Sequence, residues 1–244
     1  MIRQRLDEAL VARQVYPSRA RARDAILRGT ILVDGEPARK PSQMVLQVTV
    51  LTTADEAQKY VSRSALKLIH ALDHFEINPD GRVCLDIGAS TGGFTQVLLQ
   101  RGAEHVFAID VGHGQFDLSL QGNPRVTSIE GLNARDLTAD HLKHKIEIIV
   151  CDVSFISLKL ALPAALDLAD SGTHLIALIK PQFEAGRDAV GRGGIVSDPL
   201  EHDRVCKEIS EFVAAEHWQL IGITPSSIEG GDGNKEFLIA ARKN

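Results

Sequence analysis

The sequence contains few cysteines and few aromatic residues, and it has no long apolar run. Its three cysteines, Cys84, Cys151 and Cys206, form no CxxC pair, and no HExxH motif occurs among the 244 residues. We therefore expect no disulfide, no zinc and no other metal site. No segment approaches the roughly 20 apolar residues of a membrane-spanning helix, and the charged N-terminus lacks the apolar core of a signal peptide. These absences favour a cytoplasmic protein with no membrane partner.

Charge is distributed unevenly along the chain. Residues 1–53 contain nine Lys and Arg against five Asp and Glu, whereas residues 54–244 contain 18 against 27, and the net charge is −5. Such a contrast indicates contact between the basic part and nucleic acid, although a basic segment can also be an ordinary solvated surface. With 44% hydrophobic residues, the chain can form one large domain or two unequal ones.

The strongest local pattern is a strand, a glycine-rich turn and a helix at residues 83–99. Apolar residues fill 83–87, small residues fill 88–93, and apolar residues recur at helical spacing over 94–99. This order is typical of the first strand-to-helix connection of a doubly wound α/β fold. Other αβ crossovers also contain glycine turns, so the pattern alone does not identify a ligand.

The turn differs from the two common phosphate-binding motifs. A P-loop has Lys and then Ser or Thr after its last glycine, whereas Phe94 and Thr95 follow Gly93 here. The dinucleotide motif has a glycine where this chain has Ser90. Asp110 ends the next apolar run, where a carboxylate can accept both ribose hydroxyls of a nucleoside. A nucleoside that carries positive charge and no phosphate, such as S-adenosylmethionine, fits these residues.

Charged residues also end the later buried runs. Asp152 follows one run, and Lys180 follows another and is itself followed by Pro181. Because ligands bind outside the carboxyl ends of strands in open α/β sheets, Gly88, Asp110, Asp152 and Lys180 are expected to share one crevice. A charge at the end of a strand can also mark only the boundary with solvent.

Three further features lie outside these strand ends. Lys67 falls in a predicted helix over residues 62–75 and Glu236 opens the last predicted strand, and each alone would be an ordinary surface group. The glycine-rich residues 184–198 form a long connection, which we interpret as a mobile flap over the crevice.

Residues 1–53 are predicted to form a small α+β module. Residues 19–28 favour a helix capped by Ser18 and ended by Gly29. The stretches RLDEALV, SRARARDAILRG and ILVDGEPARKPS, with the valine-rich strand after them, resemble the S4 RNA-binding domain. The resemblance implies contact with structured RNA, and a basic appendage that binds protein is the alternative. The residues expected to contact RNA are Arg5, Arg19, Arg21, Arg23, Arg28, Lys40 and Arg63.

The whole chain resembles the TlyA, or hemolysin A, family. The resemblance rests on motifs that occur in order: VSRSALKL, CLDIGASTGGFT, DVGHGQ, NARDL, DVSFISL, IKPQFEAG and GNKEF. It implies an S4 domain at 1–53, a linker at 54–61 and an FtsJ-like methyltransferase domain at 62–244. The implied fold is α/β and Rossmann-like, with a mostly parallel sheet, an antiparallel last strand and helices on both faces. Such enzymes 2′-O-methylate cytidine in ribosomal RNA with S-adenosylmethionine.

Residue roles follow from the same resemblance. The family's catalytic Lys-Asp-Lys-Glu set corresponds to Lys67, Asp152, Lys180 and Glu236. Ribosomal RNA or a ribosomal subunit is the implied partner, with no obligate protein partner. The linker QKYV departs from the pattern of the best-known members, which have a basic residue and a tryptophan there, so we do not extend to it a role in cofactor affinity. The residues expected to contact the cofactor are Asp86, Gly88, Ala89, Ser90, Gly92, Gly93, Asp110, Val111 and Asn133.

The chemistry of ribose methylation requires a set of this kind. The acceptor hydroxyl is weakly acidic, and Lys180 beside it would favour the developing alkoxide while the other three residues orient it. A base N-methyltransferase is an alternative, because the motif DVSF resembles the acidic, aromatic-containing signature of such enzymes. The motif lacks the prolines of that signature, and base methylation would leave Lys67 and Lys180 without a role. A non-catalytic RNA-binding or assembly factor is a second alternative. A pore-forming hemolysin, suggested by the older family name, finds no support in a membrane helix or a long amphipathic stretch.

Overall fold

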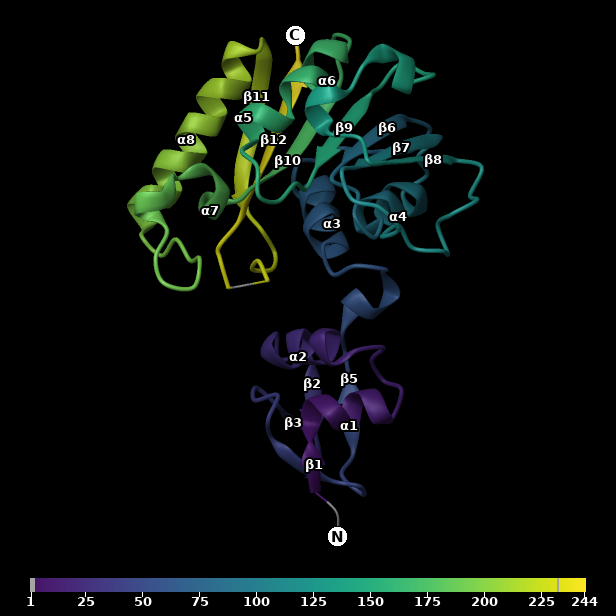
Figure 1. Cartoon of the computed structure of the whole chain (residues 1–244), viewed down its shortest axis with the longest axis vertical. Helices are drawn as coiled ribbons and strands as arrows, with labels where there is room; N and C mark the ends of the chain where they lie inside the picture. Colours follow the sequence, from purple (N-terminus) through teal and green to yellow (C-terminus); the bar gives the residue numbers. More distant parts are fainter. Residues whose placement is uncertain (1–2, 232) are drawn as a thin grey trace. The chain divides into compact units, whose positions relative to one another are not determined.

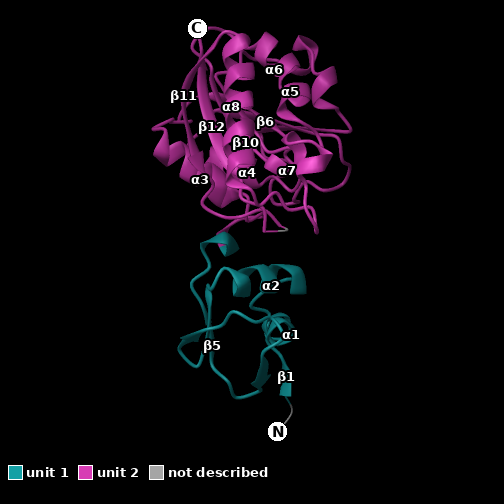
Figure 2. Ribbon diagram, turned by 90° about the vertical axis from the view of Figure 1, so that its left-hand side faces the viewer, with its two compact units in different colours: residues 1–58 teal, residues 59–244 magenta. Residues whose placement is uncertain are grey.

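The computed structural model describes residues 3–231 and 233–244, and it divides into two compact units. The first unit is Met1–Gln58 and the second is Lys59–Asn244 (Figure 2). The division falls inside the segment 54–61 that we expect to be a linker. Each unit has a hydrophobic core of its own.

The first unit combines two helices with short antiparallel strands. β1 pairs with β4, and β2 pairs with both β3 and β5. Leu6, Leu10 and Ile26 are fully buried between the helices and these strands. The elements are β1 (Arg3–Arg5), α1 (Leu6–Ala12), α2 (Arg19–Leu27), β2 (Ile31–Val33), β3 (Glu36–Pro37), β4 (Met44–Leu46) and β5 (Leu51–Thr53). The 3-10 helix η1 (Glu56–Lys59) spans the boundary between the two units.

The second helix forms where the sequence predicts it. The Ser18 hydroxyl accepts a hydrogen bond from the backbone N–H of Arg21 at 3.3 Å, which satisfies a free donor of the first turn. Gly29 follows the helix with a φ of +75°, a conformation that glycine adopts without strain. The expected valine-rich strand is instead split into β4 and β5. The guanidinium of Arg13 donates to three carbonyl oxygens of residues 46–49, which holds the chain in a turn there.

The start of the expected linker packs into the first unit. The carboxylate of Asp55 accepts two hydrogen bonds from the guanidinium of Arg28, at 2.8 and 2.9 Å, and one from the hydroxyl of Tyr16 at 2.9 Å. Burial acts to raise the pKa of Asp55, but the bonds from Arg28 and Tyr16 outweigh it and hold that pKa below its usual range. Ala57 beside it is also buried.

The second unit is built on a seven-stranded sheet with the order β11-β12-β10-β9-β6-β7-β8 (Figure 1). Neighbouring strands from β10 to β8 are parallel, whereas β12 runs antiparallel to both β10 and β11. This arrangement confirms the predicted fold class. The strands are β6 (Val83–Ile87), β7 (His105–Asp110), β8 (Val126–Glu130), β9 (Ile148–Cys151), β10 (His174–Ile179), β11 (Trp218–Pro225) and β12 (Phe237–Lys243).

Helices cover both faces of this sheet. α5, α6 and α8 pack on one face, and α3 and α4 pack on the other (Figure 1). The helices are α3 (Ala65–His74), α4 (Gly93–Gln100), α5 (Leu158–Ala161), α6 (Pro163–Leu168), α7 (Pro181–Glu184) and α8 (Pro199–Ala215), with 3-10 helices η2 (Ala134–Asp136), η3 (Ala139–His141) and η4 (Arg187–Ala189).

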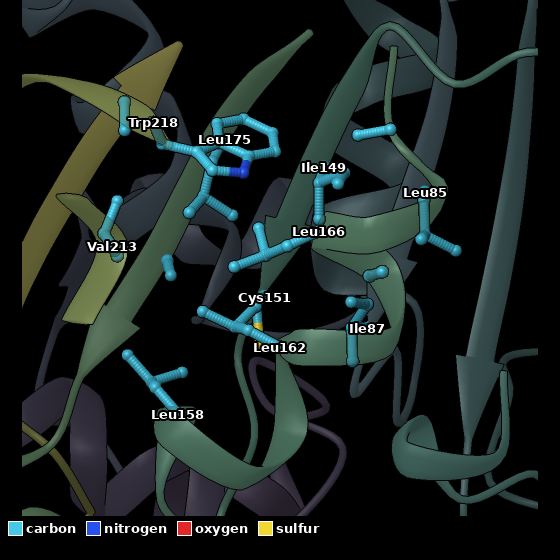
Figure 3. Close-up of a cluster of buried hydrophobic side chains, with 14 of the residues drawn as sticks. Leu85, Ile87, Ile149, Cys151, Leu158, Leu162, Leu166, Leu175, Val213 and Trp218 are labelled. Atoms are coloured by element: carbon cyan, nitrogen blue, oxygen red, sulfur yellow. The ribbon is translucent and has the colours of Figure 1, made fainter. Parts of the chain in front are cut away.

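Alternate residues of the central strands face opposite cores. Leu85 and Ile87 of β6 contribute to the cluster under α5, α6 and α8, whereas Cys84, which precedes Leu85, belongs to the cluster under α3 and α4. Figure 3 shows part of the first cluster, in which the ring of Trp218 lies beside Leu175. The parallel pairings of β10, β9, β6, β7 and β8 bring the carboxyl ends of these strands to one edge of the sheet.

Candidate active site

The glycine-rich turn between β6 and α4 brings the chain close to a neighbouring strand end. Gly88 has a φ of +81°, and a Cβ at this position would lie 2.7 Å from the carbonyl oxygen of Asp152. Only glycine permits this approach. Ser90 also has a positive φ, of 48°, and its backbone N–H donates to Asp110 Oδ2 at 2.8 Å. The other oxygen of that carboxylate accepts from the backbone N–H of Gly112 at 2.7 Å. Asp110 therefore fixes the turn to the end of β7.

A pocket of about 480 Å³ opens beside this turn, and we call it the turn pocket. It contains five of the residues expected to bind the cofactor, namely Gly88, Ser90, Asp110, Val111 and Asn133. Asn133 also caps η2, because its side-chain oxygen accepts from the backbone N–H of Arg135 at 3.1 Å. Asp152, which was predicted as a catalytic residue, also lines the turn pocket. The remaining lining residues were not predicted: Ile87, Ile109, Gln115, Leu132, Ala134, Val153, Ser154, Phe155 and Ile156.

A second, smaller pocket of about 160 Å³ adjoins the turn, and we call it the junction pocket. Ala89, which is expected to contact the cofactor, lines it together with Gly88 and Ser90. Its wall also contains hydroxyl groups that the sequence did not single out. The lining residues are Ser62, Ser64, Gly88, Ala89, Ser90, Thr91, Phe94, Asp152, Ser154 and Lys180.

Three of the expected cofactor residues lie behind these pockets and do not line them. Asp86 is fully buried, and its Oδ2 accepts from the hydroxyl of Thr95 at 2.6 Å. Its Oδ1 has no hydrogen-bond partner among the described residues, and burial raises the pKa of Asp86 to about 7. A Cβ at Gly92 would collide with Leu120, and one at Gly93 would lie 2.6 Å from Ser64 Oγ. Gly92 and Gly93 therefore allow the turn to pack closely against neighbouring side chains, and neither residue lines the turn pocket or the junction pocket.

Lys180 and Asp152 form an ion pair at the carboxyl ends of β10 and β9. Lys180 Nζ lies 2.7 Å from Asp152 Oδ1 and donates to Ser154 Oγ at 2.8 Å. Both charged side chains are largely buried, with 9% and 15% of their surfaces exposed. The parallel pairing of β10 with β9 places the two strand ends side by side, which confirms that these residues meet.

Lys67 and Glu236 form a second ion pair, although 169 residues separate them in the sequence. Lys67 Nζ lies 2.5 Å from Glu236 Oε2, and both side chains are more than 90% buried. Lys67 extends from α3 and Glu236 directly precedes β12. A helix lysine is ordinarily solvated, so its burial depends on this carboxylate.

Both lysines and Glu236 line a third pocket of about 360 Å³, which we call the lysine pocket. Asp152, the fourth predicted catalytic residue, does not line this pocket. It lines both the turn pocket and the junction pocket. Lys180 and Ser154 line both the lysine pocket and the junction pocket, so the three pockets form one connected site. The lysine pocket is lined by Lys67, Ser154, Phe155, Lys180, Gln182, Phe183, Val190, Gly194, Gly231 and Glu236.

An exposed aromatic residue stands between the turn pocket and the lysine pocket. Phe155 lines both, is 90% exposed and has a φ of +66°. Its ring lies 5.1 Å from that of Phe183. Glu184 fixes the loop that carries Phe155, because its carboxylate accepts from the Ser157 hydroxyl at 2.6 Å and from the backbone N–H of Leu158 at 2.8 Å. An exposed aromatic side chain on a residue with a left-handed backbone conformation is a feature found at functional sites. In the sequence, Phe155 stood out only as the last residue of the motif DVSF, which begins at the strand-end acid Asp152.

The basic residues expected to contact RNA have different surroundings. Arg5 and Arg19 each donate to the buried carboxylate of Asp7, both at 3.0 Å. The bond from Arg5, which outweighs the effect of burial, lowers the pKa of Asp7 to about 2. Arg28 is held between Asp24 and Asp55, so its geometry serves the packing of the first unit.

The other expected RNA-contacting residues include two with exposed side chains. Arg23 and Lys40 are exposed, whereas Arg21 donates to the carbonyl of Ala57 at 3.2 Å. Arg63 precedes α3 in the second unit and is half-buried. Among the residues that the structure describes, no helix is long and apolar enough to span a membrane.

Comparison with protein families assigns both parts of the chain. Residues 60–243 match the FtsJ-like methyltransferase family, and residues 4–47 match the S4 domain. The chain is 43% identical, over 98% of its length and 90% of the relative, to the 16S/23S rRNA (cytidine-2′-O)-methyltransferase TlyA of Mycobacterium tuberculosis. The chain belongs to the TlyA family of FtsJ-like methyltransferases.

The chain is also similar to a second named methyltransferase and to a solved structure. The 23S rRNA (cytidine-2′-O)-methyltransferase TlyA of Campylobacter jejuni is 38% identical over 76% of this chain and 72% of the relative. A solved structure of a proposed hemolysin from Streptococcus thermophilus superposes with a TM-score of 0.78 and 37% identity, covering 100% of this chain and 90% of that one. The family resemblance drawn from the sequence motifs is thereby confirmed, and the chain is an enzyme of the methyltransferase class.

Proposed function

We propose that this enzyme transfers a methyl group from S-adenosylmethionine to the 2′-hydroxyl of a cytidine in ribosomal RNA. The family and the named activities of two relatives support this reaction. The observation that carries the proposal is the ion pair of Lys180 with Asp152, which lies where the junction pocket meets the lysine pocket. We also propose the division into an S4 domain at 1–53, a linker at 54–61 and a methyltransferase domain at 62–244.

The turn pocket fits the nucleoside part of this cofactor. Gly88 permits the close approach of the turn to the end of β9, and the described residues around the pocket include two carboxylates and no lysine or arginine. Such a lining suits a cationic ligand without phosphate. Asp110 would hold the ribose, with Val111 and Asn133 beside the base, and the hydroxyls of Ser62 and Ser64 in the junction pocket would face the amino-acid part. When bound, S-adenosylmethionine supplies an electrophilic methyl group on a sulfonium.

Lys180 activates the acceptor hydroxyl in this mechanism. Its ammonium group stabilises negative charge that develops on the 2′-oxygen, in a site where partial burial strengthens the interaction. Asp152 and Ser154 hold the ammonium in place through their contacts of 2.7 and 2.8 Å. Lys67 and Glu236 form an ion pair in the wall of the lysine pocket, and this pair orients the ribose. Holding the hydroxyl in line with the methyl group supplies much of the remaining rate enhancement.

The aromatic residues at the lysine pocket favour an unpaired acceptor nucleotide. Phe155 is almost fully exposed, and its ring and that of Phe183 lie 5.1 Å apart at this pocket. A base taken out of its helical stack can rest on such a ring, which repays part of the cost of unstacking. The S4 domain would bind the surrounding RNA through Arg5, Arg19, Arg21, Arg23 and Lys40, with Arg63 at the start of the methyltransferase domain. Arg28, engaged by two carboxylates, would contribute least.

The reaction is tested by incubating purified ribosomal subunits with methyl-labelled S-adenosylmethionine and mapping the product by nuclease digestion and mass spectrometry. We expect 2′-O-methylcytidine at a defined nucleotide. A methylated base would instead indicate an N-methyltransferase. Binding to subunits without any transfer would indicate an assembly factor. Cofactor-independent leakage of liposomes would support a pore-forming activity.

A further inference from the structure

The glycine-rich segment after α7 contains one buried residue, Val196, that is bonded to other parts of the unit. Val196 is 1% exposed, whereas most of residues 186–198 are exposed. Its backbone N–H donates to Asn234 Oδ1 at 3.0 Å, and its carbonyl oxygen accepts from His202 Nε2 at 2.8 Å. The side-chain nitrogen of Asn234 also donates to the carbonyl of Gly194 at 2.9 Å. Two side chains thus satisfy both backbone groups of Val196.

Both of these side chains are buried polar groups. Asn234 is 1% exposed and His202 is 5% exposed, and the ring of His202 lies 5.5 Å from that of Phe237 in β12. A buried amide or imidazole is costly unless its hydrogen bonds are made. Because the bonds described above are made to residues 194–196, the folded unit favours the state in which the segment is docked.

The docked segment forms part of the lysine pocket. Val190 and Gly194 line this pocket, and Gly191 is bonded to Ile195 through a backbone hydrogen bond of 2.9 Å that shapes the loop between them. Asn234 lies two residues before Glu236, so the residue that holds the segment also precedes the carboxylate that pairs with Lys67. Asn234 therefore holds part of the pocket wall and lies close in the sequence to the buried ion pair.

We propose that Asn234 and His202 are positioning residues that latch residues 190–196 against the lysine pocket, so that an acceptor nucleoside binds only when the segment is docked. The identity of the acceptor rests on the proposed function, whereas the latch itself does not. Neither residue lines the turn pocket or the junction pocket. Loss of the latch should therefore weaken acceptor binding and leave cofactor binding unchanged.

Hydrogen exchange measured by mass spectrometry tests the latch without any substrate. The variants are Asn234→Ala and His202→Phe, the second of which keeps a ring beside Phe237, and Ser197→Ala is an exposed control in the same segment. Since each lost bond leaves a buried group unsatisfied, amides of residues 190–196 should exchange about ten- to hundredfold faster in both variants. The control, and peptides of β6 in all variants, should match the wild type. Unchanged exchange in 190–196, or a uniform increase throughout the unit, would overturn the proposal.

Steady-state kinetics with the RNA substrate then test the consequence for the acceptor. We expect Asn234→Ala to raise the KM for RNA about tenfold or more, with the Kd for S-adenosylmethionine within about twofold of the wild type. Because both residues hold Val196, the double variant should lose little beyond the more severe single variant. Equal loss of cofactor affinity, or additive effects of the two changes, would contradict the latch. If the wild type transfers no methyl group to RNA, the proposed function fails and hydrogen exchange alone decides about the latch.

Discussion

The turn pocket and the lysine pocket meet at Ser154 and Phe155, but they are built in different ways. The turn pocket is formed by a backbone turn and by the ends of neighbouring parallel strands. The lysine pocket depends on an ion pair between residues 169 positions apart and on a loop held by side chains. One half of the site follows from the fold class, whereas the other depends on particular long-range contacts.

This difference assigns different consequences to substitutions in the two pockets. Groups such as Asp110 at the turn pocket are partly exposed and contact backbone N–H groups, so they can be changed with modest effects on folding. Lys67 and Glu236 in the lysine pocket are buried charges, whose separation affects both folding and chemistry. The predictions below test that separation of roles.

The largest effect is expected for Lys180→Ala. This change removes the cation beside the acceptor oxygen and leaves Asp152 without its partner. Methyl transfer should fall about 10³- to 10⁴-fold in kcat, measured with saturating RNA and cofactor. Calorimetry should give a Kd for S-adenosylmethionine within about threefold of the wild type. Lys159→Ala, at an exposed lysine paired with Glu208, is the control and should keep its activity. Parallel loss of cofactor binding would show that Lys180 serves the structure of the site.

Lys67→Met tests the buried pair of the lysine pocket. The change keeps the length of the side chain but leaves Glu236, with 3% of its side chain exposed, without a counter-ion. The free energy of unfolding, measured with urea, should fall by about 3 to 5 kcal/mol. The pair of Lys145 with Asp170 is exposed, so Lys145→Met should change stability by less than about 1 kcal/mol.

A second variant keeps this test informative. Because removal of both charges avoids an unpaired buried carboxylate, the double change of Lys67→Met with Glu236→Leu should recover much of the lost stability. Equal costs for Lys67→Met and Lys145→Met would mean that the Lys67 pair is as well solvated as a surface pair.

Asp86→Asn examines the one buried acid behind the turn pocket. Burial raises the pKa of Asp86 from about 3.8 to about 7, so between these pH values the folded protein retains a proton that the unfolded chain releases. Asp86 therefore makes stability fall as the pH rises from about 4 to about 7. The variant lacks this ionisation and can still accept the bond from Thr95.

The stability gain of Asp86→Asn should consequently grow with pH. Urea unfolding should show little difference near pH 4 and a gain of up to about 4 kcal/mol above pH 7. Thr95→Val is the matched control, because it removes the bond to Asp86 and keeps the acid. A gain that is independent of pH would show that Asp86 has the same pKa in the folded and the unfolded protein, so that burial does not raise it.

Much of the fold and part of the site could be predicted from local sequence patterns. Asp110, Asp152 and Lys180 were found because each ends a buried apolar run, and parallel strands bring such ends to one edge of a sheet. Lys67 and Glu236 entered the predicted site only through the family resemblance, and their pairing was not predicted. No local pattern relates a helix lysine to a carboxylate 169 residues away.

Other features depend on geometry that no pattern contains. Asp86 was expected to contact the cofactor, but alternation along β6 directs it into the protein interior. Arg28 was expected to contact RNA because it is basic, and its engagement by Asp55 became evident only in three dimensions. The position of Phe155 depends on a loop with a positive φ, which a sequence motif does not specify.

Asp110→Ala is the counterpart of Lys180→Ala on the side of the turn pocket. The loss of a carboxylate expected to accept ribose hydroxyls should weaken S-adenosylmethionine binding about 10- to 100-fold in calorimetry. Since Asp110 does not line the lysine pocket, kcat at saturating cofactor should change by less than about threefold. Asp136→Ala, an exposed acid outside the pockets, is the control. A fall in kcat as large as that of Lys180→Ala would show that the two pockets do not divide binding from chemistry.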